Sequence, residues 1–132
     1  MVSYKCTLFF IGGELMIKRH NLGTRYSEAV IHNGVAYLCG QCCHEGNEGE
    51  KDAKVQTREI LENIDRVLAE IGSDKTKVLM ATIYLKDISY YAEMNEVWDE
   101  WIAEGHYPAR ACVEAALAER ELLVEIVVTA AV

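Results

Sequence analysis

One arginine follows the only proline of the chain and enters a run of small and apolar residues. Arg110 lies two positions after Pro108, and residues 111–113 are alanine, cysteine and valine. A buried guanidinium without a partner is costly, so Arg110 requires a partner. A carboxylate is a good one, because the planar guanidinium can hold both of its oxygens. That carboxylate belongs either to the protein or to a ligand.

Glu125 lies in the next strand-like stretch and is a candidate partner. Suppose that residues 110–115 and 122–130 form an antiparallel hairpin in which Arg110 faces Glu125. The position halfway between these two residues in the sequence then lies inside the predicted turn, so this pairing is self-consistent. Glu114 is the competing partner. In a structural interpretation the pair is an internal salt bridge. In a functional interpretation Arg110 holds a substrate carboxylate, and Glu125 positions a water or exchanges protons.

Residues 39–44 read Cys-Gly-Gln-Cys-Cys-His and suggest either a redox pair or metal ligands. A redox C-x-x-C motif belongs at the start of a helix, but Glu-Gly-Asn follows here. A zinc site normally needs four ligands, often as two spaced pairs, and the sequence has no second cluster. We therefore expect small buried or loop thiols and no bound metal. The odd number of cysteines, five in all, favours a reducing, cytoplasmic setting.

Length and charge narrow the class of protein. A chain of 132 residues forms one domain with a real core, and its net charge is −8. Nucleic-acid binders usually carry a basic stripe, so this acidity argues against a nucleic-acid partner. A small anionic substrate needs only one well-placed cation. No apolar run approaches the roughly 20 residues of a membrane span, so we expect no membrane partner.

Residues 1–15 form a separate N-terminal extension in this interpretation, and residues 16–132 form a single domain. The apolar run at residues 8–11 is short, ends in two glycines and lacks a typical cleavage site, which argues against a signal peptide. We expect residues 4–11 to form an extra edge strand or a subunit contact.

Hydrophobic periodicity predicts six strands and two helices. Asn33-Gly34 between two strand-like runs predicts a hairpin. Residues 52–71 carry one apolar face at helical spacing, with Asp52 as the N-cap and Gly72 at the end. A second helix is expected to be capped by Ser89 and to continue to about residue 102. The predicted strands are residues 16–20, 26–31, 35–39, 77–85, 110–115 and 122–130.

This element order predicts an α+β fold in which two helices cover one face of a mixed sheet. Residues 77–85 are apolar on both faces, which is typical of a central strand. Two helices cannot cover both faces of the sheet. We therefore expect homo-oligomerisation to bury the second face.

Six motifs occur in one order and spacing between about residues 16 and 132. They are Arg25-Tyr26-Ser27-Glu28-Ala29-Val30, Leu38-Cys39-Gly40-Gln41, Gln56-Thr57 with Leu61-Glu62-Asn63-Ile64, Met94-Asn95-Glu96-Val97-Trp98, Pro108-Ala109-Arg110-Ala111-Cys112-Val113 and Val124-Glu125-Ile126. Together they resemble the reactive intermediate deaminase (Rid, YjgF-like) family. The ordered set is specific for the fold and less specific for the activity, because several subfamilies share the fold.

The resemblance implies a chorismate-mutase-like fold with a six-stranded sheet, and a homotrimer with clefts between subunits. It also implies hydrolysis of 2-imino or 2-enamino acids to 2-oxo acids and ammonia, without a cofactor. Arg110 would hold the substrate carboxylate, and Glu125 would orient the attacking water. Tyr26 would line the pocket from a neighbouring subunit. Gly40 and Cys112 would offer backbone polar groups to the imine and the water.

The chain departs from the family pattern at Cys39, where the family often has serine, and in the loop that follows. Both departures lie at the expected pocket rim. The alternative function is a non-catalytic small-carboxylate-binding protein of the same fold. A ribonuclease or translation inhibitor, reported for some relatives, fits poorly with a net charge of −8.

Overall fold

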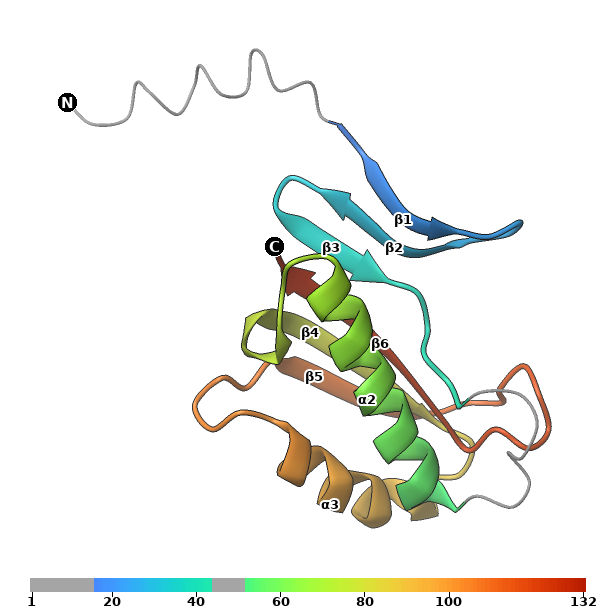
Figure 1. Cartoon of the computed structure of the whole chain (residues 1–132). Coiled ribbons are helices and arrows are strands. Elements are labelled where there is room, and N and C mark those ends of the chain that lie inside the picture. Colours follow the sequence, from blue (N-terminus) through green and yellow to red (C-terminus); the bar gives the residue numbers. More distant parts are fainter. Residues whose placement is uncertain (1–15, 44–51) are drawn as a thin grey trace.

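The computed structural model describes residues 16–43 and 52–132, which contain a mixed six-stranded sheet (Figure 1). The strands lie in the order β1-β2-β3-β6-β4-β5. Their bounds are β1 Lys18–Leu22, β2 Ser27–His32, β3 Val35–Leu38, β4 Val78–Leu85, β5 Ala109–Glu114 and β6 Val124–Ala131. The predicted six-stranded sheet is confirmed. The strand or contact expected at residues 4–11 lies outside the described residues.

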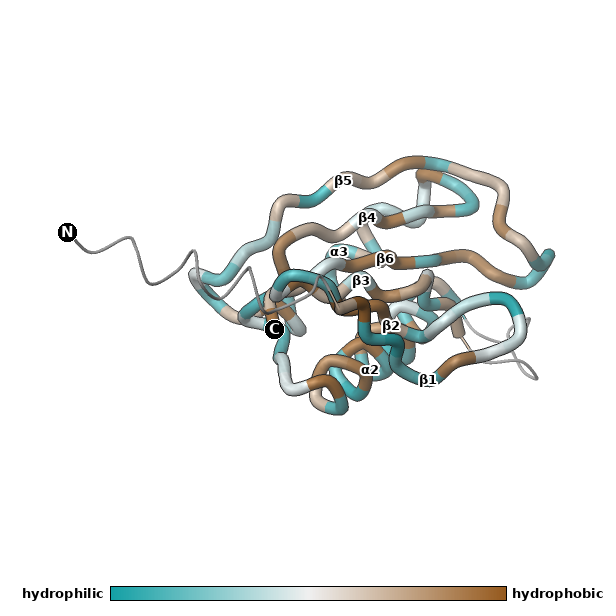
Figure 2. Tube along the Cα trace, turned by 90° about the horizontal axis from the view of Figure 1, so that it is seen from above, coloured by the Kyte–Doolittle hydropathy of each residue, from teal (hydrophilic) through white to brown (hydrophobic). Residues whose placement is uncertain are grey.

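Two helices, α2 (Ala53–Glu70) and α3 (Tyr91–Trp101), lie on one face of this sheet (Figure 1). Seen from above, α2 packs to one side of the strands (Figure 2). Asp52 begins α2 as predicted, because its side chain accepts the Val55 N–H at 2.8 Å. The apolar face of α2 and the buried residues of β6 belong to one core cluster. Two helices on one face, as the sequence predicts, are thereby confirmed.

The hairpin between β2 and β3 turns at Asn33 and Gly34, as predicted. Both residues have positive φ, 56° and 77°, as the tight hairpin turn with two left-handed residues requires. His32 then pairs with Val35 across the turn. This turn fixes the register of the two strands.

The predicted hairpin of the last two strands is wrong. β5 pairs with β4 in parallel, after a crossover through α3, and Arg110 lies beside Ala81. β6 pairs antiparallel with the other edge of β4, where Glu125 lies beside Tyr84. The chain therefore places β4 between β5 and β6, and Arg110 cannot face Glu125 within one sheet register.

A bulge between Val78 and Met80 interrupts β4, so Val78 faces the core and Leu79 is 48% exposed. The prediction that Ser89 caps the second helix is wrong. Ser89 lies in a short 3-10 helix, η3 (Ile88–Tyr90), where its N–H donates to Asp87, and no described side chain caps α3.

The sheet surface opposite the helices, which we call the open face, is mostly apolar. Strand pairing assigns to it Tyr37, Met80, Thr82, Tyr84, Val113, Glu125, Val127 and Thr129. Tyr37 and Val113 are 50% and 44% exposed. No helix of residues 16–43 and 52–132 covers this face. β4 is therefore an interior strand, between β6 and β5, that the described helices cover on one side only.

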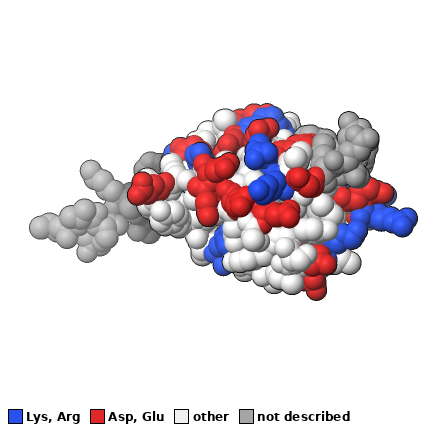
Figure 3. Space-filling model, turned by 90° about the horizontal axis from the view of Figure 1, so that it is seen from below, with Lys and Arg blue, Asp and Glu red and all other residues white. Residues whose placement is uncertain are grey.

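The chain has 21 acidic and 13 basic residues, and acidic side chains outnumber basic ones on the face shown in Figure 3. Viewed from below, the acidic side chains surround a smaller group of basic side chains (Figure 3). The described part of this face lacks the continuous basic stripe of nucleic-acid-binding surfaces. Among the described helices, none combines the length and the apolar character needed to cross a membrane.

Candidate functional site

Arg110 extends from β5 toward α3, where neutral groups surround its guanidinium. One guanidinium nitrogen donates to Asn95 Oδ1 at 2.8 Å, and another donates to the Tyr91 hydroxyl at 3.2 Å. The guanidinium carbon lies 5.3 Å from the ring centre of Trp98. Among residues 16–43 and 52–132, no ion pair involves Arg110. Its positive charge is held in place there but not neutralised.

The residues that hold Arg110 come from one face of α3. Tyr91, Asn95 and Trp98 are separated by four and three positions, which places them along one side of a helix. In the sequence, Asn95 and Trp98 belong to one of the six family motifs, but that motif assigns Asn95 no role. Tyr91, Asn95 and Trp98 share one face of the helix that precedes β5 in the chain. That shared face is the sequence signal that could have identified Asn95.

Cys112 lies two residues beyond Arg110 on the same side of β5. Its neighbour Ile83 in β4 faces the helices, so Cys112 is half-buried on the helix side. Burial raises the pKa of its thiol, and the charge of Arg110 offsets only part of this effect. Cys112 and Arg110 therefore form one group at the β5 edge.

Glu125 lies on the open face, at the other side of the sheet from Arg110. Its carboxylate approaches the end of β3, because a Cβ built on Gly40 would lie 2.5 Å from Glu125 Oε2. The Cys42 thiol lies 3.5 Å from Oε1. The structure thus brings Glu125 together with Gly40 and separates it from Arg110.

A cavity of about 550 Å³ opens beside the chain that leaves β3. Its lining includes three of the predicted site residues, Tyr26, Cys39 and Gly40. The remaining described lining residues are Glu28, Gln41, Cys42, Cys43, Asn63, Glu119 and Leu122. Tyr26 is 66% exposed at its rim. The described residues that line the cavity include carboxylates and no basic side chain. The cavity is therefore a poor binding site for an anion unless a cation from outside this lining contributes.

Two cysteines beside this cavity, Cys39 and Cys42, are neutral thiols outside any disulfide. Burial and then the charge of Glu28 raise the pKa of Cys39. Burial, reinforced by the Glu125 carboxylate, raises the pKa of Cys42 to about 12. A thiol with such a pKa is a weak nucleophile at neutral pH.

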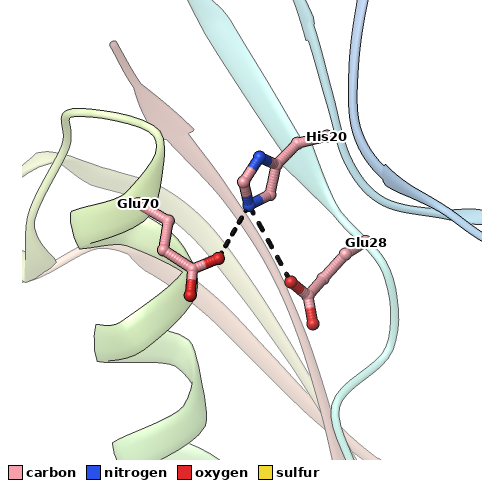
Figure 4. Close-up of side chains that lie close together, drawn as sticks. All are labelled: His20, Glu28 and Glu70. Carbon is pink, nitrogen blue, oxygen red and sulfur yellow. Dashed lines mark hydrogen bonds and ion pairs between the residues drawn. The ribbon is translucent and has the colours of Figure 1, made fainter.

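An ion-pair network that the sequence did not indicate connects the β1–β2 hairpin to α2. His20 Nε2 lies 2.8 Å from Glu70 and 4.0 Å from Glu28, with all three side chains converging (Figure 4). Arg66 donates at 2.7 Å to both carboxylates. His20, Glu28 and Glu70 could in principle hold a cation. Because Arg66 already donates hydrogen bonds to both acids, we interpret the group as an ion-pair network.

Gln41 has a structural role that the sequence did not indicate. It is only 4% exposed, and its side chain donates to the carbonyl and the sulfur of Cys39 at 3.1 and 3.2 Å. Its backbone forms an isolated bridge with Ile126. A buried polar residue directly after Gly40 therefore ties the cavity wall to β6, beside Glu125.

The predicted site residues thus fall into two groups. Arg110 and Cys112 form a cationic group beside α3. Tyr26, Cys39, Gly40 and Glu125 lie around the end of β3, where carboxylates predominate. The two groups have complementary charge and lie on different parts of the same chain.

Comparisons with known proteins identify relatives along most of the chain. The family described as endoribonuclease L-PSP matches residues 16–132. A RutC family protein of Haemophilus ducreyi is 46% identical over 89% of this chain and 97% of its own length. A crystal structure of a YjgF family member from Neisseria meningitidis is 50% identical, with a TM-score of 0.82 over 89% of this chain and 95% of that one.

A crystal structure from Yersinia pestis, described as a protein of unknown function of the Rid family, is 34% identical. It covers 84% of this chain and 90% of its own, with a TM-score of 0.77. Sequence, fold and motif order therefore agree, and the chain belongs to the endoribonuclease L-PSP (RutC, YjgF-like) family.

Proposed function

We propose that this protein hydrolyses reactive 2-imino and 2-enamino acids to 2-oxo acids and ammonia. The observation that carries the proposal is the state of Arg110. Its guanidinium is held by Asn95 and Tyr91, both neutral, and it takes part in none of the described ion pairs. A half-buried guanidinium held in this way suits a small substrate carboxylate.

The active site in this proposal is a cleft between subunits of a homotrimer. Arg110 and Cys112 of one subunit meet the end of β3 and Glu125 of another. This assignment is supported by the separation of the two groups within one chain and by their opposite charge. It differs from the expectation that Tyr26 alone comes from the neighbour, because Gly40 and Glu125 lie with the Tyr26 group.

The proposed chemistry needs no cofactor or metal. Arg110 binds the carboxylate, and Glu125 accepts a hydrogen bond from a water that attacks the imine carbon. The water oxygen bonds to the imine carbon as one water proton passes to the substrate nitrogen, which gives a carbinolamine. The remaining hydroxyl proton then passes to the same nitrogen, the C–N bond breaks, and ammonia leaves as the C=O bond forms. The imine carbon is already electrophilic, so positioning and electrostatics can supply most of the acceleration.

The first prediction tests Arg110 directly. An amino-acid oxidase would generate imino acids, and their loss to a trapping reagent would be followed with and without the protein. We expect the wild type to accelerate loss of the imine and Arg110→Ala to reduce kcat/KM by about 100-fold, because the carboxylate loses its partner. Arg110→Lys is the matched control for charge alone and should recover only part of the activity.

A second set of outcomes would contradict the proposal. Absence of acceleration by the wild type would exclude the reaction for the imines tested. Equal acceleration by wild type and Arg110→Ala would exclude the assigned role of Arg110. Circular dichroism of each variant would show that the fold is intact.

The alternative function is binding of small carboxylates without turnover, since the arrangement around Arg110 could bind an anion even if Glu125 orients no water. In that case 2-oxo acids would raise the melting temperature of the wild type, but not of Arg110→Ala, and no imine would be consumed.

The names of some relatives contain the word endoribonuclease, but a net charge of −8 does not favour RNA binding. We propose a cytoplasmic protein without nucleic-acid or membrane partners. The thiols of Cys39, Cys42 and Cys112, none of them in a disulfide, are compatible with a reducing compartment.

A further inference from the structure

A chain of side-chain hydrogen bonds leads from the ion-pair network to the wall of the cavity. Arg66 Nε donates to Asn63 Oδ1 at 2.9 Å. Asn63 Nδ2 donates to Gln41 Oε1. Gln41 Nε2 in turn donates to the sulfur and carbonyl oxygen of Cys39. We call Arg66, Asn63 and Gln41 the amide relay.

The direction of the amide relay is fixed by its first member. A guanidinium can only donate, so Arg66 requires the oxygen of the Asn63 amide to face it. The Asn63 nitrogen must then face Gln41, which turns the Gln41 oxygen toward Asn63 and the Gln41 nitrogen toward Cys39. The orientation of both amides therefore follows from chemistry rather than from the shape of the side chains.

The anchor of the relay is itself held firmly. Arg66 donates to Glu28 and Glu70, both at 2.7 Å. These carboxylates keep its guanidinium oriented between the β1–β2 hairpin and α2. The Gln41 backbone is held by Ile126 through hydrogen bonds of 2.9 and 3.0 Å. Both ends of the relay are thus attached to secondary structure, which makes it a rigid device.

The relay determines what Cys39 can offer to a ligand. Because the Cys39 sulfur accepts a hydrogen bond from Gln41, its own S–H can donate in another direction. Cys39 lines the cavity, and the thiol remains protonated because burial opposes its ionisation. The wall beside Gly40 therefore presents a neutral hydrogen-bond donor where the family often has a serine hydroxyl.

We propose that Gln41 is a positioning residue that turns the Cys39 S–H toward an acceptor atom of the substrate, the imine nitrogen or the developing carbonyl oxygen. This inference rests on the proposed function for the identity of the ligand, but the orientation of the thiol does not depend on turnover. The amide relay acts through Cys39 and does not itself touch the substrate.

Asn63→Asp is the variant that tests this direction. The introduced carboxylate can accept from Arg66 but cannot donate to Gln41. The Gln41 amide then rotates to donate to that carboxylate. The rotation breaks its hydrogen bond to the Cys39 carbonyl and turns its oxygen toward the Cys39 thiol. The S–H of Cys39 now bonds to Gln41 instead of facing the cavity. Asn33→Asp makes the same change in the β2–β3 turn, away from the relay, and is the matched control.

The S–H stretching band of Cys39 is the direct measurement. It would be assigned in the infrared or Raman spectrum by its loss in Cys39→Ala. In Asn63→Asp we expect the band to move to lower frequency, and kcat for the imine to fall several-fold while KM stays close to the wild-type value, because Arg110 is unchanged. Asn33→Asp should change neither the band nor kcat.

An unchanged band in a folded Asn63→Asp variant would overturn the inference, even if the protein is an active deaminase. A shifted band in a protein that consumes no imine would support the thiol orientation and refute the proposed function. If Asn63→Asp does not fold, Gln41→Met replaces it. Methionine cannot donate to the sulfur, so the Cys39 band should broaden, and an unchanged band would again overturn the inference.

Discussion

Glu125 holds its carboxylate against Gly40 and the Cys42 thiol. A side chain at position 40 would collide with Oε2, since even a Cβ would lie 2.5 Å away. Glycine at this position therefore leaves space for the carboxylate at the end of β3. The same closeness makes Cys42 a reporter of the Glu125 charge.

The second prediction uses this reporter. Burial and the Glu125 charge raise the pKa of Cys42 to about 12, so its thiolate is scarce at pH 8.5. In Glu125→Gln the negative charge is removed and the pKa falls, although burial keeps it above the ordinary thiol value. Alkylation of Cys42 at pH 8.5, followed by tandem mass spectrometry, should become several-fold faster. Glu119 contributes less than Glu125 to the raised pKa of Cys42, so Glu119→Gln is the control. An equal increase in the alkylation rate of Cys42 in this variant would contradict the role assigned to Glu125.

Among larger elements, the connection between the β1–β2 hairpin and α2 depends on charge. Glu28 lies in β2, Glu70 and Arg66 lie in α2, and His20 lies in β1. The hydrogen bonds from Arg66 lower the pKa of Glu28, and hydrogen bonds from His20 and Arg66 lower the pKa of Glu70. The hairpin is thus held to the helix by carboxylates that must stay ionised.

The third prediction follows from the direction of the Glu28 shift. A pKa lowered in the folded state stabilises the fold above the unfolded value of about 4.3, and this contribution disappears as the pH falls through the lower folded value. Glu28→Gln should therefore lower the free energy of unfolding by about 0.5–1 kcal/mol at pH 7. Urea titrations should show this difference shrinking below about pH 4.3.

Glu62 lies on the exposed side of α2, and Glu62→Gln is the control. At pH 7 it should lower the free energy of unfolding by less than Glu28→Gln does. A Glu28→Gln deficit that persists unchanged to pH 3 would contradict the ionic origin of the effect. In that case the loss would come from packing rather than from charge.

Local chemistry in the sequence was enough to predict several elements. Asn33-Gly34 specifies its own turn, and the α2 pattern begins at a residue whose side chain caps the helix. The pairing of β5 could not be predicted in this way. Arg110 and Glu125 are compatible with an antiparallel hairpin, and only the crossover through α3 shows that β5 returns parallel to β4.

The candidate site was predictable to a similar extent. The motifs indicated Arg110, Glu125, Tyr26, Cys39, Gly40 and Cys112 as site residues, and these roles remain predictions. They could not reveal that Asn95 and Tyr91 hold Arg110, or that Gln41 reaches Cys39. The contacts of Arg110 join residues that are 15 or more positions apart in the sequence. The contact between Gln41 and Cys39 depends on the buried path of a loop.

At the scale of the whole molecule, the site residues of one chain fall into two separate groups. A cleft that combines one group from each of two subunits can therefore be tested. The open face carries Tyr37, Val127 and Val113 on the surface away from the helices. Burial of such an apolar face is a common basis of symmetric assembly. In a trimer built on this face, Arg110 and Glu125 of different subunits could share one cleft.

The fourth prediction is complementation between two inactive variants. Arg110→Ala and Glu125→Ala should each be inactive alone but regain activity when refolded together. With equal amounts and random assembly, half of the subunits supply Glu125 and half supply Arg110, so about a quarter of the clefts contain both. The imine assay should therefore recover about a quarter of the wild-type rate.

The opposite result is equally informative. If both residues act within one subunit, mixed assemblies contain no intact site and remain inactive. Native mass spectrometry with one variant isotopically labelled would show that mixed trimers had formed, so that a lack of recovery could not be attributed to failed exchange.

The central position of β6 has a consequence for protein synthesis. β6 joins β3 to β4, so without it the sheet separates into β1-β2-β3 and β4-β5. A ribosome-bound chain that lacks β6 cannot complete this sheet. The edges of β3 and β4 that pair with β6 stay open until β6 has left the ribosome, and pairing then requires contacts between distant parts of the sequence, which form slowly. The nascent chain therefore passes through a stage at which chaperone binding is most useful.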